Sequence, residues 1–146
     1  MERAGFEVQN YYSSEIDKQA IEISTNNYPN IKRLGNVENW KQWDIDWGKI
    51  DLLIGGSPCQ GFSSSGKGLN FEDPRSKLFF VFSDILNHIK TRNPKVKFML
   101  ENVKMKEEWC NVITEYLGVN YVEINSRNFS AQNRVRYYWC NFEISD

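Results

Sequence analysis

The chain has 146 residues, of which 40% are hydrophobic and 14% are aromatic. This length predicts a single domain over residues 1–146, and this composition argues against a disordered chain. The formal net charge of −1 excludes a globally basic nucleic-acid binder but leaves local basic patches open. No apolar run approaches the roughly 18 residues of a membrane span, and no signal segment opens the chain. We therefore expect no membrane partner and a cytoplasmic location, or a nuclear one in a eukaryote.

Short strand-like runs alternate with helix-like stretches along the chain. The strand-like runs are rich in Val, Ile, Tyr and Phe and end in turn or polar residues. The predicted strands cover residues 8–14, 31–37, 50–55, 96–102, 121–126 and 136–142. The predicted helices cover residues 15–29, 76–92 and 106–118. This alternation predicts an α/β sandwich with a mostly parallel sheet, in which ligands bind at the carboxyl ends of the strands.

The cysteine and histidine content narrows the chemistry. Cys59, Cys110 and Cys140 are an odd number at wide spacings, which argues against a disulfide framework, and a single histidine argues against a zinc site. A Cys-His or Ser-His-Asp enzyme would have to use His88. That residue lies near the polar end of the predicted helix at 76–92, where a solvated imidazole suits the helix dipole.

The loop "GGSPCQGFSSSGKG" at residues 55–68 has two interpretations. It comes within one residue of the phosphate-binding pattern G-x-x-x-x-G-K-[ST], but Gly68 stands where a hydroxyl must hold magnesium, and Pro74 follows too soon for the required helix. The second interpretation is a nucleophilic sulfur. Pro58 stiffens the backbone before Cys59, the glycines permit a tight turn, and a cysteine in a polar loop fits a buried structural role poorly.

Two further elements carry chemistry. In "FMLENV", Glu101 ends an apolar strand, where an acid is costly unless it is paired or functional; a strand-end acid facing solvent is the alternative. In "AQNRVRYYW", Gln132, Arg134 and Arg136 alternate at strand spacing, which predicts that all three point to one face. A solvated strand face is the alternative there.

In this order and spacing, "GGSPCQGFS", "ENV" and "QNRVR" resemble three catalytic motifs of the cytosine carbon-5 DNA methyltransferases. The segments "YYSSEIDKQAIEISTNNYPN", "RLGNV" and "RSKLFFVF" are similar to flanking parts of that family, and "SAQNRVRYYWCNF" resembles the vertebrate de novo enzymes and phage relatives. The resemblance covers nearly the whole chain. It implies a Rossmann-like S-adenosylmethionine-dependent methyltransferase sandwich.

The resemblance also implies a reaction and its residues. A methyl group would pass from S-adenosylmethionine to carbon 5 of a cytosine that is flipped out of duplex DNA. Cys59 would attack the neighbouring ring carbon and form a covalent adduct, and Arg134 would lie near Cys59 and favour its thiolate. Glu101 would hold ring nitrogen 3 through a shared proton, and Arg136 would bind the exocyclic oxygen of the base.

A pocket for S-adenosylmethionine is implied in the same way. Glu15 would bind the ribose hydroxyls with its two carboxylate oxygens, beside Ile16. Asn36 stands where the family has an aspartate that accepts from the adenine amino group; its amide oxygen can still accept, but without charge assistance, so we expect weaker binding there. The remaining apolar or backbone contacts would come from Val37, Pro58 and Leu78.

Parts of the family fold have no counterpart in the sequence. The family begins with a strand close to F-x-G-x-G, whereas "MERAGFEV" resembles the helix after it, and the target recognition domain and closing helix are also missing. We expect a truncated sandwich with a gap between the strands at 8–14 and 50–55, where backbone groups need partners. Such a chain is expected to be inactive alone, as a truncated gene product or as one piece of a split enzyme completed by a complementary methyltransferase fragment.

Three other functions stay open at this point. The chain could be an inactive regulatory module that docks on a full-length methyltransferase, although the intact Cys59, Glu101 and Arg136 argue against selection for inactivity. It could act on RNA cytosine, since a few relatives modify transfer RNA. The third alternative is the nucleotide hydrolase that the loop pattern at 61–68 approaches.

Overall fold

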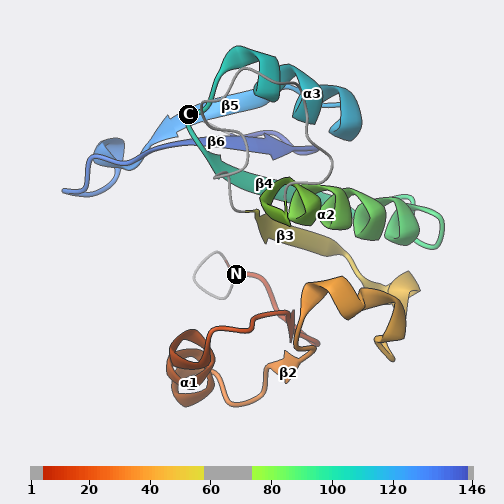
Figure 1. Ribbon diagram of the computed structural model, residues 1–146. Coiled ribbons are helices and arrows are strands. Elements are labelled where there is room, and N and C mark those ends of the chain that lie inside the picture. Colours follow the sequence, from red (N-terminus) through yellow and green to blue (C-terminus); the bar gives the residue numbers. More distant parts are fainter. Residues whose placement is uncertain (1–4, 58–73, 145–146) are drawn as a thin grey trace. The chain divides into compact units, whose positions relative to one another are not determined.

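The computed structural model describes residues 5–57 and 74–144, and the chain divides into two compact units, Met1–Ile45 and Asp46–Asp146 (Figure 1). Within the described residues, each unit contains its own sheet, with two strands in the first and four in the second. None of the helices in the described ranges has the length and apolarity needed to cross a membrane.

The first unit pairs two short parallel strands, β1 (Tyr12–Ser13) and β2 (Lys32–Arg33), with helix α1 (Lys18–Asn27) between them in sequence. Asp17 caps the helix by accepting a hydrogen bond from the Ala20 N–H at 2.8 Å, which satisfies one of the free amides at the helix start. Both predicted strands therefore exist.

Each strand of the first unit is shorter than predicted, with two residues instead of seven. After β2 the chain turns at Gly35, whose φ of 72° is a left-handed conformation that suits glycine. Asn36 then caps the 3₁₀ helix η2 (Val37–Gln42) by accepting from the Glu38 N–H at 3.0 Å. The prediction that a strand continues to Val37 was wrong because this turn and cap end it.

The second unit is built on a four-stranded sheet in the order β3-β4-β6-β5 (Figure 1). Its strands are β3 (Leu52–Gly56), β4 (Lys97–Val103), β5 (Tyr121–Asn125) and β6 (Val135–Cys140). β3 and β4 are parallel, whereas β6 is antiparallel to both β4 and β5. The prediction of a mostly parallel sheet was wrong here, because the short link between β5 and β6 allows a hairpin but not the long crossover that a parallel pair needs.

Helices α2 (Pro74–Lys90) and α3 (Glu107–Leu117) lie on one face of this sheet and contact each other through aromatic rings. Trp139 of β6 is fully buried on that face, and its indole N–H donates to the Thr114 hydroxyl of α3 at 3.0 Å. The one-turn 3₁₀ helices η3 (Trp47–Lys49) and η5 (Ser126–Asn128) complete the unit.

Gly55 lets α2 approach β3 closely. A Cβ atom at this position would lie 2.6 Å from Cδ2 of Phe82, a buried residue of α2, so the ring packs directly on the strand backbone. The next residue, Gly56, faces the opposite side of the sheet.

Candidate active site

Glu101 lies near the carboxyl end of β4, on the sheet face opposite the helices. Along β4, the buried Phe98, Leu100 and Asn102 alternate with half-buried residues, as strand geometry requires when one face is covered. The Glu101 side chain is 30% exposed. An acid in this setting is partly desolvated, which favours a charged partner.

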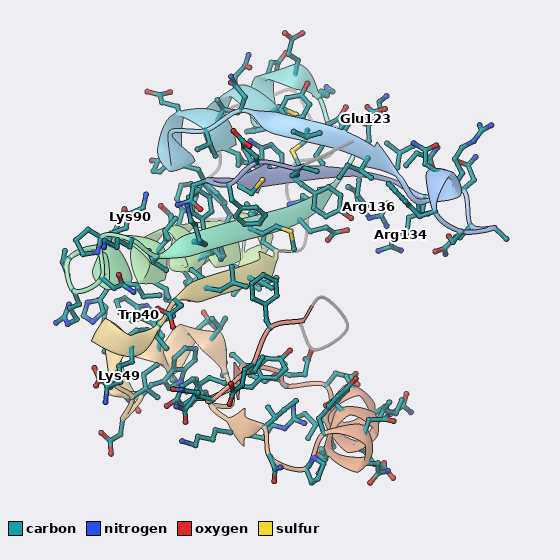
Figure 2. The ribbon with its side chains drawn as sticks, turned by 180° about the vertical axis from the view of Figure 1, so that it is seen from behind. Trp40, Lys49, Lys90, Glu123, Arg134 and Arg136 are labelled. Carbon is teal, nitrogen blue, oxygen red and sulfur yellow. The ribbon has the colours of Figure 1, made fainter. Side chains whose placement is uncertain are left out.

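Two arginines, Arg134 and Arg136, which are labelled in Figure 2, supply that partner. Nε of Arg136, on β6, lies 2.8 Å from Oε1 of Glu101, and a terminal nitrogen of Arg134 lies 3.7 Å from the same oxygen. The Arg136 side chain is 19% exposed, and its buried Nε–H makes no aligned hydrogen bond within the described ranges, so the 2.8 Å contact is an ion pair. Its guanidinium also donates to the Val135 carbonyl at 2.7 Å, which fixes its orientation.

The end of β3 faces this cluster. Gly56 pairs with Glu101 in the parallel register, and a Cβ atom on Gly56 would lie 3.4 Å from Oε2 of Glu101. The chain thus leaves β3 directly beside the carboxylate. Pro58 and Cys59, which the sequence assigns to the cofactor pocket and to nucleophilic attack, lie outside the described residues.

The structure brings together Glu101, Arg134 and Arg136, but not Gln132. β6 begins at Val135, so the prediction of one continuous strand face was wrong for Gln132, which belongs to the preceding turn, where its carbonyl accepts from the Ser126 hydroxyl at 2.6 Å. Arg134 precedes the strand, yet its side chain still extends to Glu101.

Sequence reasoning missed Asn102. This side chain is 1% exposed; its amide donates to the Ser57 hydroxyl at 3.3 Å, and its carbonyl oxygen accepts from the Val103 N–H at 2.8 Å. It therefore ties β4 to the last described residue before the proline-cysteine pair. The sequence did offer a signal: in the alternation along the strand, Asn102 falls on the same face as the buried Phe98 and Leu100. A polar residue at such a core position must be hydrogen-bonded.

His88 lies at the other end of the sheet. It contacts the Trp47 ring edge-on at 5.0 Å, just before β3 begins, whereas Glu101 pairs with Gly56 at the end of β3. The imidazole is half-buried rather than solvated, and burial, with a smaller effect of Arg92, lowers the pKa of His88. Its position argues against any role as the base for chemistry at Glu101.

Neither described cysteine resembles a reactive thiol. Cys110 is buried in α3, and burial raises the pKa of its thiol, which keeps the sulfur protonated and unreactive. Cys140 is half-buried in β6, with its sulfur 3.4 Å from the Phe142 carbonyl. Both agree with the structural role that the sequence predicts for them.

Four of the residues assigned to the cofactor pocket lie in the first unit, beyond the carboxyl ends of its parallel strands. Glu15 and the 69% exposed Ile16 follow β1, and Asn36 and Val37 follow β2. The Ser14 hydroxyl donates to the Gly35 carbonyl at 2.7 Å and links the two turns.

The polar groups of these turns are partly engaged. Oε1 of Glu15 accepts from the N–H groups of Ile16 and Asp17 at 2.8 and 2.9 Å, which orients the carboxylate and leaves Oε2 as the available acceptor. The side-chain amide oxygen of Asn36 caps η2 and retains a second lone pair as an acceptor. Leu78 is a half-buried residue of α2, in the second unit.

Comparisons with known proteins identify the family of this chain. Residues 1–143 match the family model described as C-5 cytosine-specific DNA methylase. Over 70% of this chain, the sequence is 45% identical to the Type II methyltransferase M.NgoBI of Neisseria gonorrhoeae. Over 96% of this chain, it is 43% identical to the Type II methyltransferase M.HaeII of Haemophilus aegyptius. These alignments cover 31% and 46% of the two relatives, so the chain spans less than half of either.

A solved structure shows the same fold. A putative DNA modification methyltransferase encoded within an Escherichia coli prophage is 25% identical and superposes with a TM-score of 0.66 over 99% of this chain and 44% of that protein. The mixed α/β sheet with its helices is thus the Rossmann-like methyltransferase fold. The family model and these relatives show that the chain belongs to the C-5 cytosine-specific DNA methylase family.

Proposed function

We propose that this chain supplies the catalytic centre of a DNA (cytosine-5-)-methyltransferase. The observation that carries the proposal is the Glu101 carboxylate, held by Arg136 at 2.8 Å and Arg134 at 3.7 Å beside the end of β3. This cluster presents a carboxylate and guanidinium donors side by side. That set complements the ring nitrogen and the exocyclic oxygen on one edge of a cytosine.

The reaction must first make carbon 5 of cytosine nucleophilic. The Cys59 thiolate adds to the neighbouring ring carbon, a sulfur–carbon bond forms, and the ring π electrons move to carbon 5. Carbon 5 would then take the methyl group of S-adenosylmethionine, whose sulfur–methyl bond breaks to release S-adenosylhomocysteine. Carbon 5 next loses its proton to a base, and the electron pair of that carbon–hydrogen bond re-forms the ring double bond as the sulfur–carbon bond breaks and the thiolate leaves. The cytosine must leave the base stack for this chemistry, because the ring is inaccessible within a duplex.

Glu101 and the arginines stabilise the charge that develops on the ring. Glu101 shares a proton with ring nitrogen 3, and Arg136 donates to the exocyclic oxygen. The partly buried Arg136 is already oriented by the Glu101 carboxylate and the Val135 carbonyl, so little reorganisation is required when the base arrives. Arg134, which is 49% exposed, adds positive charge that favours the Cys59 thiolate.

The residues of the first unit fit the nucleoside part of S-adenosylmethionine, which supplies an electrophilic methyl group when bound. Oε2 of Glu15 would accept from a ribose hydroxyl, and the Asn36 carbonyl oxygen would accept from the adenine amino group. Ile16 and Val37 offer apolar surface beside them. The resemblance also assigns Leu78 and Pro58 to S-adenosylmethionine binding.

The test uses a protein that restores the length of the relatives. In the HaeII chimera, residues 1–143 of this chain replace the matching segment of M.HaeII, to which the chain is 43% identical. We expect the chimera to transfer labelled methyl groups from S-adenosylmethionine to cytosine in unmethylated genomic DNA, and the chain alone to give no turnover. A folded chimera without labelled 5-methylcytosine would contradict the proposed function, and clear turnover by the isolated chain would contradict its inactivity alone.

A further inference from the structure

The turn that joins β5 to β6 carries charge of one sign. Residues 125–136 read "NSRNFSAQNRVR", with three arginines and no acid, in a chain whose net charge is −1. Arg134 and Arg136 share the single carboxylate of Glu101, whereas Arg127 forms no ion pair with any residue in the described ranges. Among the described residues of this cluster, three positive charges face one negative charge, which leaves an excess of two.

Phe129 stands in the middle of this turn. It is 80% exposed, which makes it the most exposed large hydrophobic side chain in the described part of the molecule. A single exposed apolar residue needs no explanation by itself. An exposed aromatic ring next to unpaired positive charge, however, is the combination by which proteins hold single nucleic-acid strands.

Hydrogen bonds join the two sides of the turn in the absence of a ligand. The Asn125 amide donates to the Asn133 carbonyl oxygen at 2.8 Å, and the Ser126 hydroxyl donates to the Gln132 carbonyl at 2.6 Å, so its two sides are joined twice. The Phe129 N–H donates to the Ser126 carbonyl at 2.9 Å. A ligand that binds here meets a preformed surface, which lowers the entropic cost of binding.

The turn also lies at the end of the sheet where Glu101 is found. The hairpin of β5 and β6 extends past the carboxyl end of β4 (Figure 1), and Arg134 and Arg136 lie at its base beside Glu101 (Figure 2). A strand whose cytosine reaches Glu101 is therefore bound at the same end of the sheet as the turn.

We infer that residues 126–134, the β5–β6 turn, form a contact surface for the DNA strand that carries the target cytosine. Phe129 stacks on the face of the neighbouring base that flipping of the cytosine exposes, and Arg127 contacts a backbone phosphate. The inference rests on the proposed function and adds two binding residues to it. Neither residue touches the reacting atoms.

The experiment measures binding by the 146-residue chain to a fluorescein-labelled single-stranded DNA oligonucleotide, by fluorescence anisotropy between about 50 and about 200 mM salt. Phe129→Ala is expected to weaken binding about tenfold without changing the salt dependence, because it removes stacking and no charge. Arg127→Gln is expected to weaken binding and to reduce the slope of log Kd against log salt by about 0.7, the value for one phosphate contact on a single strand.

Two control substitutions are at positions far from the β5–β6 turn in the sequence. Phe6→Ala removes a second exposed phenylalanine, and Lys95→Gln removes an exposed cation; neither is expected to change DNA binding. The inference is overturned if wild type fails to bind DNA, if Phe129→Ala binds as wild type does, or if Phe6→Ala weakens binding equally. Tighter binding to RNA of the same sequence, or to an acidic protein, would also overturn it. Methyl transfer by the HaeII chimera is measured in a separate assay. A failure of the DNA-binding inference therefore does not contradict the proposed function.

Discussion

Replacement of Cys59 by serine in the HaeII chimera is expected to reduce methyl transfer by at least about 10³-fold. A serine hydroxyl is a far weaker nucleophile than a thiolate near neutral pH, so addition to the cytosine ring becomes the limiting step. The measurement is incorporation of labelled methyl groups into DNA. DNA binding is expected to stay near the wild-type level, because the substitution changes one atom.

Cys140→Ser is the matched control. Cys140 is half-buried in β6, and its sulfur contacts the Phe142 carbonyl, so the exchange keeps a hydrogen-bonding group of similar size. Methyl transfer by this variant should remain within a few-fold of wild type. Undiminished transfer by Cys59→Ser, or an equal loss in Cys140→Ser, would contradict the assignment of the nucleophile.

Glu101→Gln is expected to lower kcat by about 10²- to 10⁴-fold, the usual contribution of a residue that transfers a proton in the transition state. The amide keeps the shape of the side chain but cannot share a proton with ring nitrogen 3 as a carboxyl group does. It also removes the charge that pairs with Arg136 and Arg134. The loss should appear in kcat rather than in KM for DNA, because the interaction strengthens as charge develops on the ring.

Glu123→Gln provides the control on the neighbouring strand. Glu123 is paired with Lys104 at 3.3 Å, and both side chains are largely exposed, so the exchange removes an ion pair of little energetic weight. Its kcat should match wild type. Equal losses in the two glutamine variants would show that the effect of Glu101 is structural, and an unchanged kcat in Glu101→Gln would remove it from the catalytic centre.

Local patterns predicted the elements of this fold well. The helix expected at 106–118 ends at Gly118 because that residue takes a left-handed φ of 71° and its N–H bonds to the Thr114 carbonyl. In β4, "KFMLENV" shows the alternation that places Leu100 on the covered face and Glu101 on the other. These features depend on residues that are close in sequence.

The pairing of strands could not be predicted in the same way. β6 is the last strand of the chain but lies between β4 and β5, and this order depends on contacts between distant segments. For the same reason, sequence alone did not place Arg134 against Glu101 from outside the strand, nor Asn102 against Ser57. The chemical roles of Cys59 and Glu101 came from resemblance to a family, and only their residue types and surroundings came from the pattern.

The most direct test replaces the target cytosine by 5-fluorocytosine in DNA that the HaeII chimera methylates. Fluorine on carbon 5 cannot leave as a proton does, so the covalent adduct should persist after methyl transfer. Digestion and mass spectrometry are predicted to find the modified nucleotide on the peptide that contains Cys59. If an active chimera yields no adduct, Cys59 does not act through a covalent intermediate. An adduct on the peptide that contains Cys110 or Cys140 would equally contradict the assignment of Cys59 as the nucleophile.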